Sequence, residues 1–225
     1  MAQNSRDQLL ALLATNSFRL GDFTLASGRK SDYYIDCRTT TLHARGAELT
    51  GHVFYDLIRE QGWRPQAIGG LTMGADPIVV AVSVISSQAG APIHGFLVRK
   101  SEKAHGMGRR IEGFQEQGSS VVIADDVCTT GGSTIQAIEA AREFGFEIAG
   151  AICLVERLEA AGRPAVEKAA SPAPFISVYT SDQVKSAHVR LKSAPQTFAY
   201  SGSCEVCGRP AVTNTPGLRC DVHQP

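Results

Sequence analysis

The spacing of the hydrophobic residues changes near position 65, and this change divides the chain into two regions. In the first region, apolar residues at helical spacing predict helices over 4–16 and 42–60. Two β-prone pieces, 23–25 and 33–35, lie on either side of a turn-rich segment. We therefore predict an N-terminal α+β region that includes a hairpin-like element.

After position 65, short apolar runs alternate with helical stretches. Strands are predicted at 67–70, 93–98, 120–124, 148–155 and 175–179. Helices are predicted at 76–88 and 133–144, with a peripheral helix and linker in 160–174. Short, continuous β-branched runs separated by helices are typical of a parallel sheet that is covered on both faces. We therefore predict an α/β fold, doubly wound around a mainly parallel sheet.

The composition is that of a soluble globular protein and limits its partners. The chain has 225 residues, of which 43% are hydrophobic and 20% charged, and its formal net charge is zero. A zero net charge provides no overall basic field for nucleic acid or anionic lipid. The longest apolar stretch, 78–85, is far shorter than the roughly 20 residues that a membrane-spanning helix needs. Because the N-terminus also lacks a secretory pattern, we expect a cytoplasmic protein without nucleic-acid or membrane partners.

The segment 121–134 combines an apolar run, two carboxylates and a turn rich in hydroxyls and glycine. The strand is predicted to end before Asp125 and Asp126, and a helix is predicted to begin after the turn. Backbone N–H groups of 130–133 then point outward at the positive end of the helix, which favours a phosphate. No lysine follows the glycines, so the turn differs from a nucleoside-triphosphate P-loop and suits a monophosphate. The alternative is a solvated acidic turn with an ordinary helix cap.

The segment 99–118 is glycine-rich and charged, and it is longer than most connections in a compact domain. Its first residues include four cationic candidates, Arg99, Lys100, Lys103 and His105. Flanking glycines can act as hinges, and long loops of this kind are usually lids or binding loops. We predict a mobile lid, and the alternative is a solvated basic hairpin.

Arg157 follows the predicted strand 148–155, on the same sheet edge as Asp125. Ligands of open α/β sheets bind beyond the carboxyl ends of the strands. A guanidinium fork matches a planar carboxylate with two parallel hydrogen bonds. Arg157 is therefore a candidate for binding a carboxylate, and the alternative is a surface arginine paired with Glu156 or Glu159.

The end of the chain carries a separate pattern of metal-binding residue types. Cys204 and Cys207 are followed by Cys220 and His223, which is the ligand set and spacing of a closed structural zinc site. We predict a zinc knuckle here. The alternatives are a disordered tail with incidental cysteines and a redox-active Cys-x-x-Cys.

The order of parts in 121–134 resembles the phosphoribosyl pyrophosphate motif of the type I phosphoribosyltransferases. Within that family, the segments 23–31, 69–77 and 99–106 resemble the orotate phosphoribosyltransferases. The resemblance runs from about residue 7 to about residue 190. It implies a type I phosphoribosyltransferase fold, with a doubly wound, mainly parallel sheet and an N-terminal α+β hood. The implied boundaries are a hood over 1–65, a core over 66–199 with the mobile loop 99–118, and the Cys/His tail over 200–225.

The same resemblance implies an activity. It is the transfer of the 5-phosphoribosyl group from phosphoribosyl pyrophosphate to orotate, giving orotidine 5′-monophosphate and pyrophosphate in de novo pyrimidine biosynthesis. Mg²⁺ is the implied cofactor, and a homodimer with shared active sites is implied because the loop serves the other subunit. Two alternatives are a phosphoribosyltransferase for another nucleobase and a non-catalytic, nucleotide-sensing regulator on the same fold. A regulator that binds RNA or DNA needs a basic face, which a zero net charge does not support.

The resemblance also implies the roles of individual residues. The acid pair Asp125 and Asp126 holds the ribose hydroxyls, and the turn 72–76 meets the pyrophosphate. The lid cations cover the pyrophosphate, and the implied catalytic residues are Lys103, His105 and Asp126. The residues that wrap the 5-phosphate are Val127, Cys128, Thr129, Thr130, Gly131, Gly132 and Ser133.

Orotate is implied to contact Thr129 and Arg157, with Tyr33 and Tyr34 as aromatic neighbours of the base. The chain departs from some family members at two positions, because Met73 and Ala26 stand where those members have lysine. Neither position contributes charge here. The positive charge near the pyrophosphate therefore shifts to the lid.

Overall fold

The computed structural model describes residues 2–24, 30–100, 110–193, 200–203 and 210–213. The chain divides into two compact units, 1–191 and 192–225. Within the described ranges, none of the helices has the length and the apolar character to cross a membrane. The larger unit contains the sheet and the candidate site.

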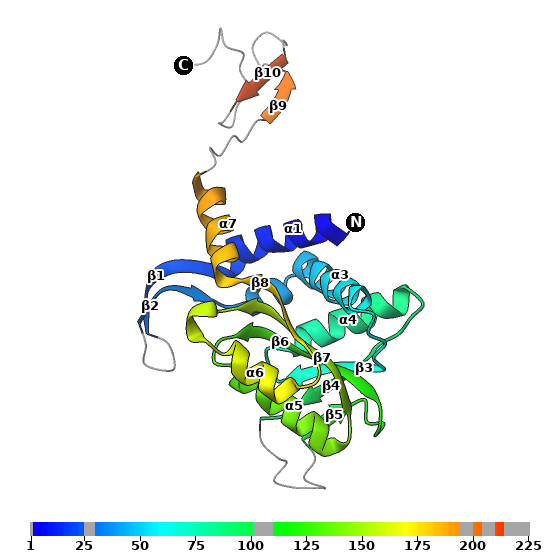
Figure 1. The fold of residues 1–225 in the computed structure, drawn as a ribbon. Helices are drawn as coiled ribbons and strands as arrows, with labels where there is room; N and C mark the ends of the chain where they lie inside the picture. The colour runs from blue at the N-terminus through cyan, green and yellow to red at the C-terminus, as the bar shows by residue number, and fades with distance from the viewer. Residues whose placement is uncertain (1, 25–29, 101–109, 194–199, 204–209, 214–225) are drawn as a thin grey trace. The chain divides into compact units, whose positions relative to one another are not determined.

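A six-stranded sheet forms the centre of the larger unit, in the order β5-β4-β3-β6-β7-β8 (Figure 1). Its strands are β3 (Ala67–Leu71), β4 (His94–Val98), β5 (Ile111–Gly113), β6 (Ser120–Cys128), β7 (Glu147–Glu156) and β8 (Phe175–Thr180). All neighbouring pairs are parallel except β5 with β4. The predicted parallel sheet is confirmed. The β5 strand was not predicted because it has only three residues in a charged segment and depends on pairing with β4.

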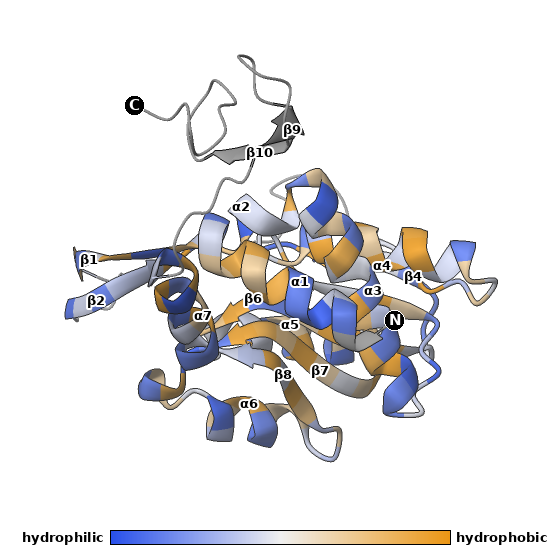
Figure 2. Cartoon of the chain, turned by 90° about the horizontal axis from the view of Figure 1, so that it is seen from above, coloured by the Kyte–Doolittle hydropathy of each residue, from blue (hydrophilic) through white to orange (hydrophobic). Residues whose placement is uncertain are grey.

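Helices cover both faces of this sheet, as a doubly wound fold requires. One face packs against α1 (Ala2–Leu12), α3 (Ala44–Glu60) and α4 (Asp76–Gln88), and the other packs against α5 (Gly132–Phe144) and α6 (Arg163–Ala170) (Figure 1). Successive residues of β6 serve opposite faces, since Val122 joins the first core and Val121 and Ile123 join the second. The central strands are accordingly among the most apolar segments (Figure 2).

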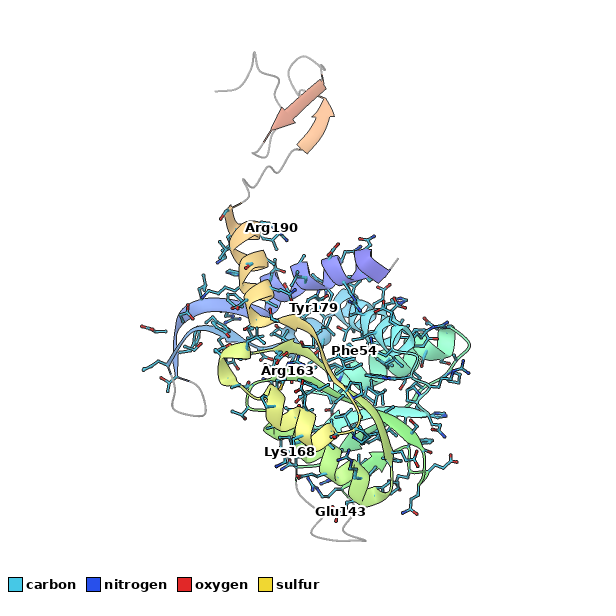
Figure 3. All side chains as sticks on the ribbon, in the orientation of Figure 1. Phe54, Glu143, Arg163, Lys168, Tyr179 and Arg190 are labelled. Atoms are coloured by element: carbon cyan, nitrogen blue, oxygen red, sulfur yellow. The ribbon has the colours of Figure 1, made fainter. Side chains whose placement is uncertain are left out.

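The region 1–65, predicted as a hood, contains α1, a π-helical turn (Leu13–Ser17), the strands β1 (Phe18–Thr24) and β2 (Lys30–Ile35), the short helix α2 (Arg38–Thr41) and α3. The strands pair antiparallel, so the predicted hairpin-like element is confirmed. The hood is attached through fully buried side chains, including Leu9, Leu13 and Phe54 of α3 (Figure 3). The predicted helix over 4–16 differs in detail, because the α-helix ends at Leu12 and one wider turn continues it.

The helix α7 (Ser181–Ser193) follows β8 directly and was not predicted. Its sequence is mostly polar, and it buries only a few side chains, among them Val184 and Ala187. Polar contacts to the hood hold the region in place. The Tyr179 hydroxyl donates to the Arg6 carbonyl at 2.6 Å, and His188 Nδ1 lies 2.6 Å from the Ala14 carbonyl oxygen (Figure 3 labels Tyr179).

The smaller unit contains an antiparallel hairpin of β9 (Tyr200–Ser203) and β10 (Pro210–Thr213). Ser203 pairs with Pro210 at the end of this hairpin. Neither strand was predicted, because four residues are too few to show a hydrophobic period. The four predicted zinc ligands Cys204, Cys207, Cys220 and His223 lie outside the described residues.

Candidate active site

The acid pair lies within a strand and not after it. β6 continues to Cys128, with Asp125 in register with Cys153 of β7, so the predicted strand end at 124 is wrong. The ladder with β7 continues through the acids, and it carries Asp125 into the interior, where its residue exposure is 4%. Asp125 Oδ2 accepts a hydrogen bond from Thr134 Oγ1 at 2.6 Å, and Oδ1 accepts one from the Asp126 amide at 3.0 Å.

Burial makes both acids harder to ionise. It raises the pKa of Asp125 to about 7, although the hydrogen bond from Thr134 opposes this rise and the charge of Asp126 adds to it. Burial also raises the pKa of Asp126, while the hydrogen bond from the Val127 amide and the charge of Arg38 lower it. The folded protein therefore holds two adjacent acids whose pKa values are both raised.

The turn after β3 packs directly against this pair. A Cβ atom placed on Gly74 would lie 2.3 Å from Asp126 Oδ1, so only glycine permits this approach. The peptide bond between Thr72 and Met73 in the same turn is cis. The turn that was predicted to meet pyrophosphate and the pair that was predicted to hold ribose therefore share one wall.

The loop between β6 and α5 provides a set of amides at the start of a helix. Gly131 precedes α5 with a φ of +81°, a conformation that side chains disfavour, and α5 begins at Gly132. The first amides of a helix have no partner within it and carry the positive end of its dipole. The loop borders a cavity of about 590 Å³, which suits an anion such as a phosphate.

A second cavity of about 450 Å³ adjoins the first, and the two share Leu71, Lys100, Asp125, Val127, Thr129, Thr130 and Ser133. The second cavity extends between the sheet and the hood, where Tyr34 and Arg157 border it. The predicted substrate-binding residues that line one cavity or both are Lys100, Asp125, Asp126, Val127, Thr129, Thr130, Gly131, Gly132, Ser133 and Arg157. The structure thus brings together residues from separate sequence motifs.

Three of the predicted positions are arranged differently. The Cys128 side chain is buried, and its thiol is hydrogen-bonded to that of Cys153, so only its backbone is available to the loop. Arg99 lies 3.4 Å from Glu112 and is not among the residues that line the two cavities. Tyr33 packs in the hood core, while Tyr34 borders the cavity.

Arg157 is almost fully buried, with a residue exposure of 6%. The alternative of a surface arginine is therefore wrong, although the expected pairing with Glu159 is present at 2.9 Å. Glu156 pairs with Arg163 instead. The Arg157 guanidinium also lies 4.4 Å from the centre of the Tyr33 ring. The contacts with Glu159 and Tyr33 therefore hold the Arg157 side chain beside the cavity.

Sequence reasoning missed an ion pair in the cavity wall. Arg38 donates to both carboxylate oxygens of Asp36, at 2.8 and 2.9 Å, and both residues line the cavity of about 450 Å³. The charge of Arg38 also lowers the pKa of Asp126. No local motif marks these residues, because only the packing of the hood on the sheet brings them to the acid pair.

Several predicted residues lie outside the described residues. They are Ala26 in the hood, Lys103 and His105 in the lid, and the four Cys and His residues of the tail. Their roles stay predictions.

Comparisons with known proteins agree on one family. Residues 39–175 match the model of the phosphoribosyl transferase domain. The orotate phosphoribosyltransferase of Rhodopirellula baltica is 43% identical over 154 residues, which are 67% of this chain and 80% of that protein. The orotate phosphoribosyltransferase of Aquifex aeolicus is 41% identical over 175 residues, which are 76% of this chain and 94% of that protein.

A solved structure supports the same assignment. The orotate phosphoribosyltransferase of Mycobacterium tuberculosis H37Rv, in complex with 5-phospho-α-D-ribosyl 1-diphosphate (PRPP), is 32% identical and superposes with a TM-score of 0.66. The match covers 80% of this chain and 99% of that one. The expected type I phosphoribosyltransferase fold is thereby confirmed. This chain belongs to the phosphoribosyltransferase family and, within it, to the orotate phosphoribosyltransferases.

Proposed function

We propose that the two adjoining cavities are the site at which this enzyme transfers the 5-phosphoribosyl group from PRPP to orotate. The products are orotidine 5′-monophosphate and pyrophosphate, which places the enzyme in pyrimidine biosynthesis. One observation carries the assignment of the site. Asp125, Thr130 and Ser133 border both cavities, while Asp126 borders the cavity of about 450 Å³ and Gly131 and Gly132 border the adjoining one of about 590 Å³. The acid pair and the amide-rich start of α5 therefore lie along one continuous space, and together they match the diol and the phosphate of one sugar phosphate.

The sugar phosphate is proposed to bind through its 5-phosphate and its ribose hydroxyls. The 5-phosphate accepts hydrogen bonds from the amides around Gly131 and Gly132 and from the hydroxyls of Thr130 and Ser133. The ribose hydroxyls donate to the carboxylates of the acid pair, of which Asp126 is the more accessible. Ionised carboxylates accept such hydrogen bonds more strongly than protonated acids, so binding of the ribose opposes the rise that burial causes in the pKa of both acids.

The leaving group is proposed to lie between the turn 72–76 and the lid. Departure of pyrophosphate develops negative charge, which Lys100, Lys103 and His105 stabilise while the closed lid excludes water. Met73 supplies no charge in this turn, so the lid cations provide more of the positive charge near the pyrophosphate. Lys103 and His105 are assigned here from the sequence alone.

Orotate is proposed to bind at the hood end of the cavity. Arg157 and Tyr34 border that end, and Thr129 is close enough along the loop to line the same space. A buried guanidinium is a strong and directional partner for the orotate carboxylate. Adenine and guanine carry no carboxylate, so this residue favours orotate over them.

The site fits Mg²⁺ held mainly by the substrate. Orotate phosphoribosyltransferases typically depend on this ion. Over the described part of the chain, no three His, Cys, Asp or Glu side chains are grouped to hold a metal. Mg²⁺ prefers oxygen ligands and retains several waters, so Asp126 would hold it together with substrate oxygens. When bound, Mg²⁺ neutralises charge on the pyrophosphate.

A homodimer is supported by an apolar patch beside the pyrophosphate turn. Leu42, Met73, Val80 and Val84 are 71%, 65%, 61% and 49% exposed, and a groove of about 670 Å³ runs between α3 and α4. Exposed apolar patches of this kind mark interaction surfaces. The proposal is that a second copy binds this patch beside the pyrophosphate turn and contributes its lid to the site there.

A structural zinc ion in the tail is a separate proposal. In the β9–β10 hairpin Ser203 pairs with Pro210, and Cys204 and Cys207 lie between these two residues in the sequence. A Cys-x2-Cys pair supplies two of the four ligands in many structural zinc sites. Metal analysis of protein purified without chelator tests it. One zinc per chain, lost on replacing Cys204 and Cys207 by serine, is expected, and absence of zinc refutes the proposal.

The activity is tested by following orotate absorbance in the presence of PRPP and Mg²⁺. Orotate is expected to disappear only when both are present, and pyrophosphate is expected to form in equal amount. Uracil, adenine and guanine serve as competing bases in parallel reactions. Consumption of one of these bases with orotate untouched would overturn the substrate assignment.

A further inference from the structure

Glu159 is a carboxylate with a 44% exposed side chain that the proposed mechanism does not use. It lies in a short 3-10 turn (Leu158–Ala160) immediately after β7, outside the residues that line the two cavities. Its Oε1 accepts from Arg157 Nε at 2.9 Å and also from the Tyr33 hydroxyl. Its Oε2 lies 3.4 Å from Ser181 Oγ at the start of α7. One carboxylate therefore connects the hood, the end of β7 and α7.

These contacts restrict the Arg157 guanidinium from several sides. Nε is taken by Glu159, and Nη2 donates to Ser31 Oγ of β2 at 3.0 Å. The face of the guanidinium lies on the Tyr33 ring, which is itself stacked on Phe18 at 5.3 Å between centroids. Among contacts between described residues, Nη1 makes none. The terminal edge of the fork is thus the part left for a ligand in the cavity.

The pKa shifts of Tyr33 and Glu159 favour an ionised Glu159 paired with the charged Arg157. Burial raises the pKa of Tyr33, and its hydrogen bond to Glu159 raises it further, so the hydroxyl stays protonated and donates. The pKa of Glu159 is lowered, because hydrogen bonds from Tyr33 and Arg157 outweigh the opposing effect of burial. An unpaired guanidinium at this depth would be costly and free to rotate.

We propose that Glu159 is a positioning residue for orotate, acting through Arg157 and Tyr33. It holds the guanidinium so that its terminal edge faces the cavity, and it locks the hood strand that supplies Ser31 and Tyr33 against the sheet. This inference rests on the proposed function, because it takes Arg157 as the partner of the orotate carboxylate. Glu159 does not touch the substrate, so it should influence orotate binding and leave PRPP binding unchanged.

The test compares steady-state constants for Glu159→Ala, Glu159→Gln and Arg157→Gln. Glu159→Ala is expected to raise the KM for orotate about tenfold or more, which corresponds to losing one charge-assisted contact, with the KM for PRPP within about twofold. Glu159→Gln keeps an oxygen that accepts from Tyr33 and Arg157, and it is expected to restore part of the loss. Tyr33→Phe, which keeps the stacked ring, is expected to have a smaller effect in the same direction.

Glu167→Ala is the matched control, because Glu167 pairs with Arg163 on the outer face of α6 and is 51% exposed. It should leave both KM values unchanged. An unchanged orotate KM in Glu159→Ala, with a raised one in Arg157→Gln, would overturn this inference alone. Equal increases in both KM values with a lowered melting temperature would also overturn it, because they indicate a structural role. An unchanged orotate KM in Arg157→Gln would instead refute the proposed base site.

Discussion

Gly74 and Asp126 are in direct contact across the candidate site, since a Cβ atom at position 74 would lie 2.3 Å from a carboxylate oxygen of Asp126. The contact joins the turn after β3 to the acid pair on β6. It couples the proposed positions of pyrophosphate and ribose, so a change in one should displace the other.

Gly74→Ala is therefore expected to lower activity strongly. The added methyl group must push Asp126 aside or open the turn, and overpacking of this kind costs about 1–3 kcal/mol. We expect kcat/KM for PRPP to fall by about a hundredfold, since about 1 Å of misplacement can have that effect. Steady-state kinetics and thermal unfolding measure the two changes.

Gly62→Ala provides the control for stability alone. Gly62 has a φ of +71° with open space around it, so alanine there costs roughly 1 kcal/mol through backbone strain only. It should destabilise the protein and retain activity. Normal activity in Gly74→Ala would show that the contact with Asp126 has no part in the reaction.

Asp125 is expected to make the ligand-free protein less stable as the pH rises. Its folded pKa is about 7, against about 3.9 in an unfolded chain, so the folded state binds the extra proton between these values. The free energy of unfolding should consequently fall from about pH 4 to about pH 7 and then level off. A shift of this size corresponds to about 4 kcal/mol.

Asp125→Asn removes this titration and keeps an oxygen for Thr134. The variant should gain stability relative to the wild type as the pH rises from 5 to 8, while its activity falls. Denaturant unfolding at both pH values measures the difference, and the same substitution at the exposed Asp22 serves as control. A wild-type stability that rises over this interval would refute the raised pKa.

Lys103→Ala is expected to lower kcat by about a hundredfold, because a cation that meets charge mainly in the transition state contributes most to the chemical step. The KM for PRPP should change little. Lys168→Ala on α6 removes an exposed lysine away from the cavities and should behave as the wild type (Figure 3). Turnover equal to that of the wild type in Lys103→Ala would remove this residue from the mechanism.

Val80→Glu is expected to separate the proposed dimer. The side chain is 61% exposed on α4, and a charge there would be buried unpaired in the interface. Light scattering should report a monomer, with activity reduced at least tenfold because the partner lid is absent. Val189→Glu on α7, where the side chain is 47% exposed, is the control. A wild-type protein that is itself a fully active monomer would contradict the shared site.

Much of the fold followed from local pattern. The strands β3, β6 and β7 each contain a continuous apolar run, and α4 and α5 begin after clear turn residues, so the parallel sheet could be predicted. β5 and α7 could not, because pairing with β4 and contacts such as that of His188 with Ala14 determine them. These are tertiary effects without a local signal.

In the candidate site, too, some features follow from local sequence and others only from tertiary contacts. The residues around Asp125 and Gly131 form one contiguous motif, so their chemistry could be predicted from the sequence. The Arg38–Asp36 pair could not, because only the packing of the N-terminal region on the sheet brings it to the acid pair. The contact of Glu159 with Tyr33 could not, because these residues are 126 positions apart and meet only in the folded chain. The continuation of β6 through the acids was missed because carboxylates are unusual in a buried strand.

The most direct test of the central claim is a crystal structure of the enzyme with PRPP. The account predicts the ribose hydroxyls within hydrogen-bond distance of Asp125 or Asp126 and the 5-phosphate at the amides of 130–133. PRPP bound elsewhere, with the start of α5 occupied only by solvent, would contradict it.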